Sequence, residues 1–157
     1  MPLAADLSWI ENTSAVRFIA TTPLVYPLLS AFHLFGIALV FGSIVPVDLR
    51  LLRVVGPQFD RALPSLIHIA LIGFALAASS GILLASVQIG VYVKKPVFLA
   101  KLLILLLAGV SALLLRLHSG TRGIAGMVGR PAGRIAAIVS LSLWTAAVLA
   151  GRWIAFS

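Results

Sequence analysis

Four long stretches of the chain are almost entirely apolar, and the charged residues gather between them. The stretches run over 23–47, 64–89, 96–117 and 135–154. Because about 20 helical residues cross a hydrocarbon layer of about 30 Å, each stretch is long enough to span a membrane. Backbone groups cannot stay unpaired in lipid, and no stretch alternates as a barrel strand does. We therefore predict an all-α fold, an integral membrane four-helix bundle that forms a single membrane domain over 1–157.

Residues 8–20, SWIENTSAVRFIA, precede the first span and have a different pattern. Ser8 followed by Glu11 fits a capping box at the start of a helix, and Trp9 and Phe18 are apolar. This pattern predicts a short interfacial amphipathic helix on the membrane surface, with Trp9 at the depth of the headgroups. The alternative is an irregular tail.

The composition agrees with a membrane protein and excludes several other classes. The chain is 61% hydrophobic and 10% charged, whereas a soluble domain carries about 25% charged residues. It has no cysteine, which excludes disulfides, thiolate catalysis and thiolate metal sites. The net charge of +8 comes from basic residues at the ends of the apolar stretches, without an aromatic-rich basic stripe. Such charge suits anionic headgroups, so we expect the lipid bilayer as a partner and no nucleic acid.

The basic residues are unequally divided between the two sides of the predicted bundle. One side carries Arg50, Arg53, Arg61, Arg116, Arg122, Arg130 and Arg134. The other side carries Arg17, Lys94, Lys95 and Arg152. Because loops rich in Lys and Arg stay in the cytoplasm, we predict cytoplasmic arginine-bearing loops and both termini outside.

An ionisable ring interrupts the first span. His33 lies ten residues after Pro23, which is about 15 Å into the bilayer. Small residues on the same helix face, Ser30, Gly36 and Ser43, let another helix or a flat ligand come close. A neutral imidazole at this depth can bond across the bundle, ligate a metal or bind haem iron. The alternative is a core histidine that only holds two helices together.

Lys101 lies five residues into the third span and has two possible directions. Its long side chain can snorkel outward to the headgroups. If it turns inward instead, its tip reaches the level of His33, where a cation can meet a haem propionate, a quinone oxygen or an acidic substrate. His33 and Lys101 together are more suggestive of a cofactor site than either residue alone.

Two further histidines lie near the predicted cytoplasmic edge. His68 follows Pro64 by four residues, and His118 closes the third span. A bis-histidine haem site needs two rings at matched depth. The pair His68 and His118 matches better than His33 and His68, which differ by about 9 Å in depth. All three histidines are therefore candidate haem or metal ligands, and the alternative for His118 is contact with headgroups.

Asp48 closes the first span within the segment VDLRLL. We expect it to pair with a nearby arginine and to fix the geometry of the inner end, rather than to take part in proton chemistry. The partners available in sequence are Arg50, Arg53 and Arg61. The spans contain neither paired carboxylates nor a serine placed with a histidine and an acid, so no catalytic residue is predicted and enzymatic activity is left open.

Two segments carry a resemblance to known proteins. AFHLFGIALVFGSIVPVDLRLL resembles the first core helix of small bacterial four-helix integral membrane proteins of unknown function, and KPVFLAKLLILLLAGVSALLLRLH resembles their third. More distantly, a histidine on the first helix with a lysine on the third is similar to the copper-resistance D and HemJ-type protoporphyrinogen oxidase group. That resemblance implies a b-type haem in the bundle, with His33 as axial ligand and Lys101 near the cofactor. The segment KPVFLA lacks the tryptophan–histidine pair of the HemJ type, so the resemblance extends to the haem site and not to porphyrinogen oxidation.

The resulting hypothesis is a b-type haem protein of the bacterial inner membrane. We expect it to pass electrons between a quinone and a periplasmic redox partner, as the membrane subunit of a complex, with both termini periplasmic. The alternative is a non-redox anchor or assembly subunit whose histidines are structural. Copper handling is a third hypothesis, weakened because the chain lacks thiols and has only two methionines.

Overall fold

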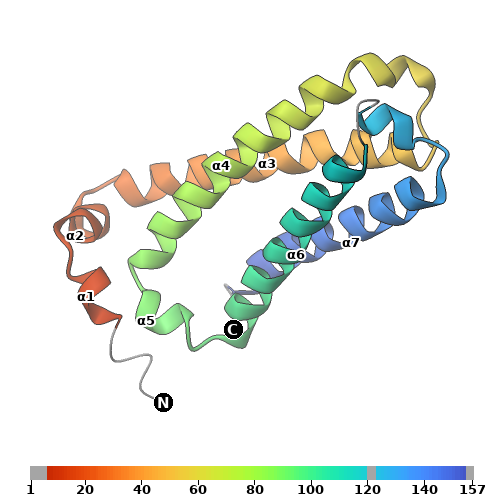
Figure 1. The fold of residues 1–157 in the computed structure, drawn as a ribbon. Coiled ribbons are helices and arrows are strands. Elements are labelled where there is room, and N and C mark those ends of the chain that lie inside the picture. Colours follow the sequence, from red (N-terminus) through yellow and green to blue (C-terminus); the bar gives the residue numbers. More distant parts are fainter. Residues whose placement is uncertain (1–6, 120–122, 155–157) are drawn as a thin grey trace.

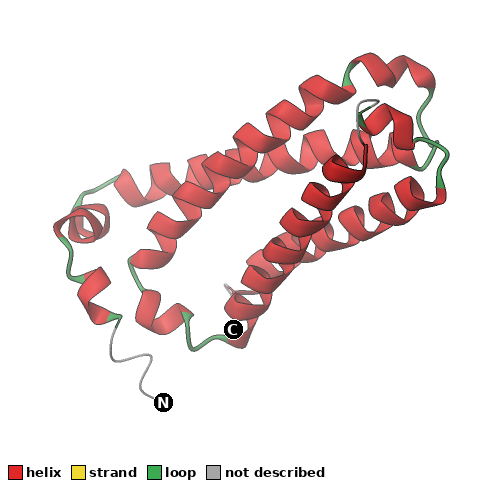
Figure 2. Ribbon diagram, viewed as in Figure 1, coloured by secondary structure: helices red, strands yellow, loops and turns green. Residues whose placement is uncertain are grey.

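The computed structural model describes residues 7–119 and 123–154, and the described part contains helices and no strand (Figures 1 and 2). The long helices are α3 (Val25–Leu51), α4 (Leu63–Ser86), α6 (Pro96–Ser119) and α7 (Pro131–Trp153). The short helices are α1 (Ser8–Glu11), α2 (Ser14–Thr21), η2 (Pro57–Arg61), α5 (Ile89–Tyr92) and η4 (Ile124–Met127). The predicted all-α fold with four long apolar helices is confirmed.

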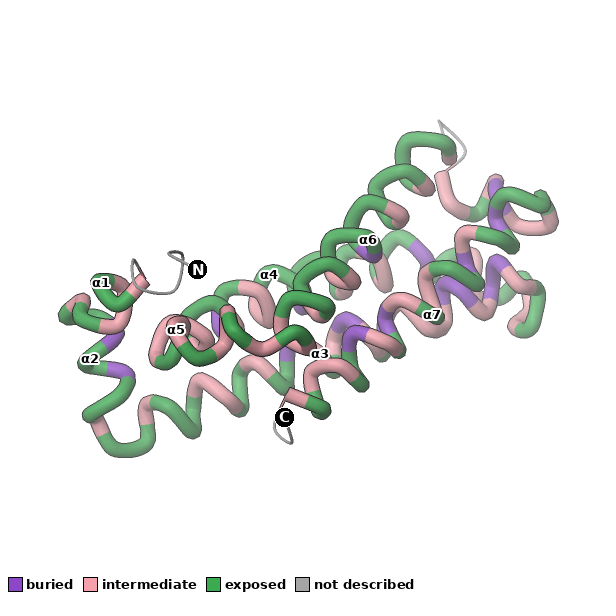
Figure 3. Tube along the Cα trace, turned by 90° about the horizontal axis from the view of Figure 1, so that it is seen from below, coloured by how far each residue is buried: buried purple, intermediate pink, exposed green. Residues whose placement is uncertain are grey.

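Each of the four long helices is long and apolar enough to cross a membrane. Their large apolar side chains are mostly exposed, and α6 buries only Ala108 along its whole length (Figure 3). Soluble monomers rarely expose apolar surface of this extent, because water would drive it into contact with something else. The chain is therefore a multi-pass membrane protein with four candidate spans.

The ends of the helices differ from the predicted spans by a few residues. α3 continues to Leu51 rather than ending at 47, since Pro46 is accommodated inside the helix. α7 begins at Pro131 rather than at 135, because proline suits the first helical turn, where a missing N–H leaves no bond unmade. The second span ends at Ser86, and α5 follows it as a separate turn.

The four long helices form two packed pairs. α3 packs along α4, α6 packs along α7, and α3 also contacts α7. Two small buried clusters join the pairs: Val40 with Ala108 and Trp144, and Leu51 with Met127 and Ala137. α4 and α6 form no such packed pair and lie apart in Figure 1. The bundle is thus joined through α3 and α7 and open between α4 and α6.

Glycines set the close approach of α3 and α4. A Cβ on Gly36 would lie 2.6 Å from the Ala77 backbone nitrogen and 2.9 Å from the Gly73 carbonyl oxygen. A Cβ on Gly73 would lie 2.7 Å from the Cβ of Leu39. Small residues allow such backbone contact between membrane helices, where packing replaces the hydrophobic effect as the source of association. Gly36 of the predicted small-residue face therefore lies at a helix contact.

The segment before the first span forms two short helices instead of the single predicted one. Thr13 has an extended backbone and separates α1 from α2. The expected capping box is absent, because Leu7 rather than Ser8 occupies the N-cap position. The Glu11 carboxylate instead accepts the Gly90 N–H at 2.9 Å and so holds α1 against α5. Trp9 is 66% exposed, and its placement among headgroups stays a prediction.

The two ends of the bundle differ in the short helices that they hold. The loop end holds η2 and η4, and the terminal end holds α1, α2 and α5 (Figure 1).

Gly36→Ala should destabilise the protein because the new methyl group meets backbone atoms that cannot move aside. Overpacking of this kind costs about 1–3 kcal/mol in the free energy of unfolding. Gly42→Ala is the matched control on the same helix, since a Cβ there meets nothing within 4 Å. Unfolding of both variants in detergent, followed by circular dichroism, measures the difference. Equal stability of the two variants would contradict the α3–α4 contact.

Candidate functional site

His33 links α3 to α4. Its Nδ1 lies 2.8 Å from the Ala77 carbonyl oxygen and 3.3 Å from the Ser80 hydroxyl. A carbonyl oxygen only accepts hydrogen bonds, so Nδ1 carries the proton and donates it. In the neutral ring the lone pair then lies on Nε2. The imidazole lies against Gly81, where a Cβ would come within 2.8 Å of Cε1.

Lys101 on α6 packs against α7. Its Nζ would lie 3.4 Å from a Cβ on Gly151, and the residue is half-buried. Gly151 lies two residues before the end of α7, so this contact fits both directions considered for the side chain, and both stay predictions. His33 and Lys101 come from different helix pairs, α3 with α4 and α6 with α7.

The other two histidines lie elsewhere. His68 is nine residues before Ala77 on α4, which is about 14 Å along the helix axis. It is exposed and belongs to the loop end. His118 is also exposed, and its Nδ1 lies 3.0 Å from the Leu114 carbonyl oxygen of its own helix. Within the described residues, no three histidine or acidic side chains are grouped closely enough to hold a metal ion.

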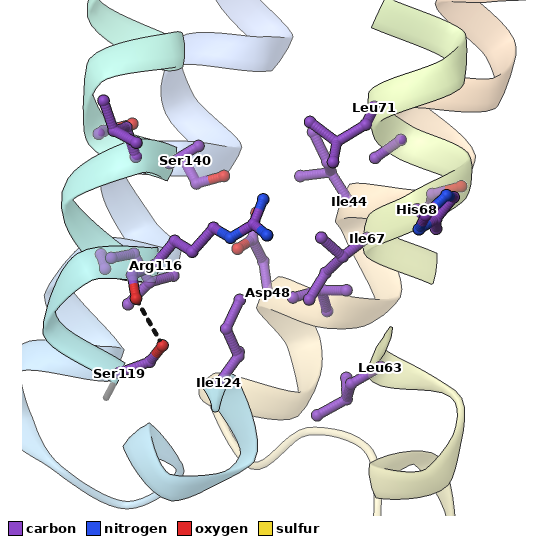
Figure 4. Close-up of a pocket in the computed structure, with 18 of the residues that line it drawn as sticks. Ile44, Asp48, Leu63, Ile67, His68, Leu71, Arg116, Ser119, Ile124 and Ser140 are labelled. Atoms are coloured by element: carbon purple, nitrogen blue, oxygen red, sulfur yellow. Dashed lines mark hydrogen bonds between the residues drawn. The ribbon is translucent and has the colours of Figure 1, made fainter. Parts of the chain in front are cut away.

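A cavity of about 770 Å³ occupies the loop end (Figure 4). All four long helices contribute to its wall, together with residues of η2 and η4. Its apolar lining includes Ile44, Leu63, Ile67, Leu71, Phe74, Leu113 and Ile124. Its polar lining includes Ser43, Asp48, His68, Ser111, Arg116, Ser119, Ser140 and Trp144. His68 is therefore a wall residue of this cavity, whereas His33, Lys101 and His118 are not among its lining residues.

The arginine two residues after Asp48 does not pair with it. Arg50 instead makes a bidentate ion pair with Asp60, with Nε 2.6 Å from Oδ1 and Nη2 3.1 Å from Oδ2. The Arg53 guanidinium lies against Gly129. Asp48 shares a cavity wall with Ser140 of α7. The expected pairing with Arg50, Arg53 or Arg61 is wrong, because the ion pair found among the described residues joins Arg50 to Asp60 of η2 and leaves Asp48 out.

Within residues 7–119 and 123–154, two buried polar atoms of residues that line the cavity have no hydrogen-bond partner. They are Oδ2 of Asp48 and Nε1 of Trp144, whose residues are 2% and 8% exposed. An unpaired buried polar group costs about 1–3 kcal/mol, so each such group calls for an explanation, such as strain, a bound water or ion, or a functional role. From the sequence, Asp48 was expected only as a partner of an arginine, and Trp144 was not predicted to have a role. Helical spacing could have indicated the burial of Asp48, because it places this residue on the same face of α3 as Val40 and Val47.

Comparison of the chain with protein-family models, with curated proteins and with solved structures gives no match in any of the three. The resemblance to haem-binding membrane proteins therefore stays a prediction from short motifs. Two polar regions of the structure remain as candidate sites, His33 with Lys101 and the loop-end cavity.

The Arg50–Asp60 ion pair should make stability depend on pH. Its hydrogen bonds hold the pKa of Asp60 below the usual range. The contribution is therefore complete above the unfolded-state pKa of about 3.9 and is lost as pH falls through the lower folded-state value. Asp60→Asn should lower the melting temperature in detergent at pH 7, and the difference from the unmodified protein should shrink at pH 3. A difference that is the same at both pH values would exclude this charge effect.

Proposed function

We propose that the protein binds b-type haem through His33 and acts in electron transfer within the inner membrane. The observation that carries the proposal is the His33 Nδ1–H bond to the Ala77 carbonyl oxygen, which leaves Nε2 as the nitrogen able to ligate iron. Ligating histidines usually donate their other ring N–H to a carbonyl or carboxylate, which fixes the tautomer and the ring orientation. Bound b-type haem supplies one-electron redox chemistry.

Lys101 has the second role at this site. A half-buried ammonium group favours an anionic partner, and haem carries propionates. Glycines lie beside both side chains, Gly81 at the His33 ring and Gly151 at Nζ of Lys101, and the two side chains themselves fill the space that these glycines leave. The support for haem from His33 and Lys101 is therefore the chemistry of their donors.

We do not propose His68 or His118 as ligands of the haem iron. His68 is about 14 Å along α4 from Ala77, the residue that His33 contacts, which is nearly half the thickness of the hydrocarbon layer. His118 is exposed near the other end of α6 from Lys101. We assign the axial position supplied by this chain to His33 alone.

The proposed orientation places the loop end in the cytoplasm and both termini in the periplasm. It follows from the excess of arginine in the α3–α4 and α6–α7 connections. Haem at His33 then lies in the periplasmic half of the bundle. That position suits a membrane subunit that passes electrons between a quinone and a periplasmic redox partner.

A second function, a non-redox anchor or assembly subunit, is favoured by one observation. The same bond from His33 to Ala77 joins α3 to α4 at a glycine contact, and this accounts for the histidine without a cofactor. Interhelical hydrogen bonds in membranes contribute about 0.6–2 kcal/mol, which is enough for a structural role.

The absorption spectrum of the purified protein separates the two functions. Protein from haem-sufficient cells should be red, with reduced-minus-oxidised bands of b-type haem that vanish or shift in His33→Ala. His68→Ala and His118→Ala are matched controls that should keep the spectrum. A folded, colourless preparation would exclude the haem site and favour the anchor, as would a spectrum unchanged in His33→Ala.

Lys101→Met tests the charge beside the cofactor. Removal of a nearby cation favours the oxidised form, so the midpoint potential of the haem should fall by tens of millivolts while the haem content stays the same. Lys94→Met, near the membrane surface, is the control and should leave the potential almost unchanged. An equal potential in the two variants would remove Lys101 from the site.

A further inference from the structure

The wall of the loop-end cavity changes in character along the spans. On α4 it extends from Leu63 to Phe74, which is about 16 Å along the helix axis. Toward the middle of the bundle the wall is mainly apolar, with Leu71 and Phe74 on α4 and Leu113 on α6. Toward the loop end it includes Arg116, three residues before the end of α6. The cavity is therefore apolar at the depth of lipid chains and charged close to the ends of the spans.

The cavity is accessible on the side of α4 and α6. Its wall residues Leu71 on α4 and Leu113 on α6 are exposed, and both helices are candidate spans. The two helices form no packed pair (Figure 1). The cavity volume of about 770 Å³ falls within the range of about 300–1,000 Å³ that is usual for small-molecule sites. A single-chain molecule dissolved in the bilayer can therefore enter the cavity from the lipid.

Arg116 is the charged group of the wall that a ligand can reach. Two of the three charged residues described in the wall are acidic. Asp60 is held in the bidentate ion pair with Arg50, and Asp48 is 2% exposed, so neither offers a free charge to the cavity. Arg116 is exposed and extends into the cavity from α6 (Figure 4), and within residues 7–119 and 123–154 its guanidinium makes no ion pair. Charge complementarity therefore favours an anion at this position.

The chemistry of a single guanidinium favours a carboxylate over other headgroups. A guanidinium donates two parallel hydrogen bonds to the two oxygens of a carboxylate, and one positive charge balances one negative charge. A phosphate monoester carries a charge of about −1.5 to −2 and three acceptor oxygens, which one arginine does not satisfy. A cationic headgroup would meet the like charge of Arg116, and a neutral one would leave the guanidinium without a counterion.

We propose that the loop-end cavity binds a long-chain fatty acid, with the carboxylate at the Arg116 guanidinium and the acyl chain along the apolar wall toward Phe74. The headgroup then lies close to the ends of the spans and the chain runs toward the middle of the bilayer, as in the surrounding lipid. A phospholipid with one negative charge is the competing occupant. It carries two chains, whereas the cavity has the size of a site for one small molecule. The site requires neither haem nor His33.

Equilibrium binding of radiolabelled palmitate to the full-length protein in phosphatidylcholine nanodiscs tests the site. Protein-free nanodiscs are the blank for partition into lipid. We expect saturable binding of one equivalent, which unlabelled palmitate displaces. 1-Hexadecanol has the same chain length and no charge, so it should displace the label about tenfold less effectively than palmitate.

Variants of Arg116 test the headgroup position. Arg116→Gln should weaken palmitate binding about tenfold or more, because a charged hydrogen-bond donor is lost. Arg116→Lys keeps the charge without the planar fork and should retain part of the affinity. Arg134→Gln is the matched control, because Arg134 is an exposed arginine near the loop-end start of α7 that does not line the cavity. This control should bind palmitate as the unmodified protein does.

A pair of glycine variants tests the position of the acyl chain. Gly109 on α6 lines the cavity, and a Cβ there meets nothing within 4 Å, so the bundle has room for a larger side chain. Gly109→Phe should place a ring where the chain packs and weaken binding about tenfold or more. Gly42→Phe is the control, since a Cβ on Gly42 also meets nothing within 4 Å and Gly42 does not line the cavity. Circular dichroism and gel filtration establish that the variants fold.

Four results would overturn the site. The first two are uptake equal to the protein-free blank and equal displacement by hexadecanol and palmitate. The third is binding that is unchanged in Arg116→Gln or in Gly109→Phe. The fourth is displacement by phosphatidylglycerol that equals displacement by palmitate, which would assign the site to a two-chain phospholipid. Palmitate binding is measured without reference to haem, so its failure leaves the proposed cofactor intact and the absence of haem leaves this site intact.

Discussion

The backbone contact between α3 and α4 at Gly36 and Gly73 is the constraint on which the rest of the bundle depends. It holds α4 along one side of α3 while α7 occupies another. α4 and α6 form no packed pair, and both contribute to the wall of the loop-end cavity together with α3 and α7. The same contact brings the Ala77 carbonyl oxygen within 2.8 Å of the His33 ring. Both polar regions of the protein thus involve this close helix pair.

Polar groups in the spans fall into two classes that differ in the free-energy cost of their burial. The His33 N–H donates a hydrogen bond to the Ala77 carbonyl oxygen on the neighbouring helix. The Ser80 hydroxyl donates to the Leu76 carbonyl oxygen of its own helix at 2.5 Å. Such paired groups are common where membrane helices meet. Asp48 Oδ2 and Trp144 Nε1 are buried without a partner, which is unfavourable in any medium of low dielectric constant. The unpaired groups are therefore the more costly feature of the spans, although the histidine is the more conspicuous residue in the sequence.

The two regions share α3 and lie toward opposite ends of it. Fifteen residues separate His33 from Asp48, which is about 22 Å along the helix axis. In the orientation proposed above, the loop-end cavity lies in the inner half of the bilayer and the proposed haem site in the outer half. The ion pair of Arg50 and Asp60 joins the end of α3 to η2 at the loop end.

The sequence by itself determined the helical class, the number of candidate spans and the membrane environment. Each of these depends on local hydropathy and length, and backbone pairing in lipid then requires helices. It also placed His33 and Lys101 at compatible depths, since depth along a helix is a simple count of residues. Only the tertiary structure decided that Lys101 packs against Gly151 of α7, that Arg50 bonds to Asp60 rather than pairing with Asp48, and that Trp144 shares a cavity wall with Asp48. These facts depend on the rotation of each helix about its axis and on which helices pack together. Four spans of nearly uniform hydrophobicity carry little information about either, because lipid and protein interior are almost equally apolar.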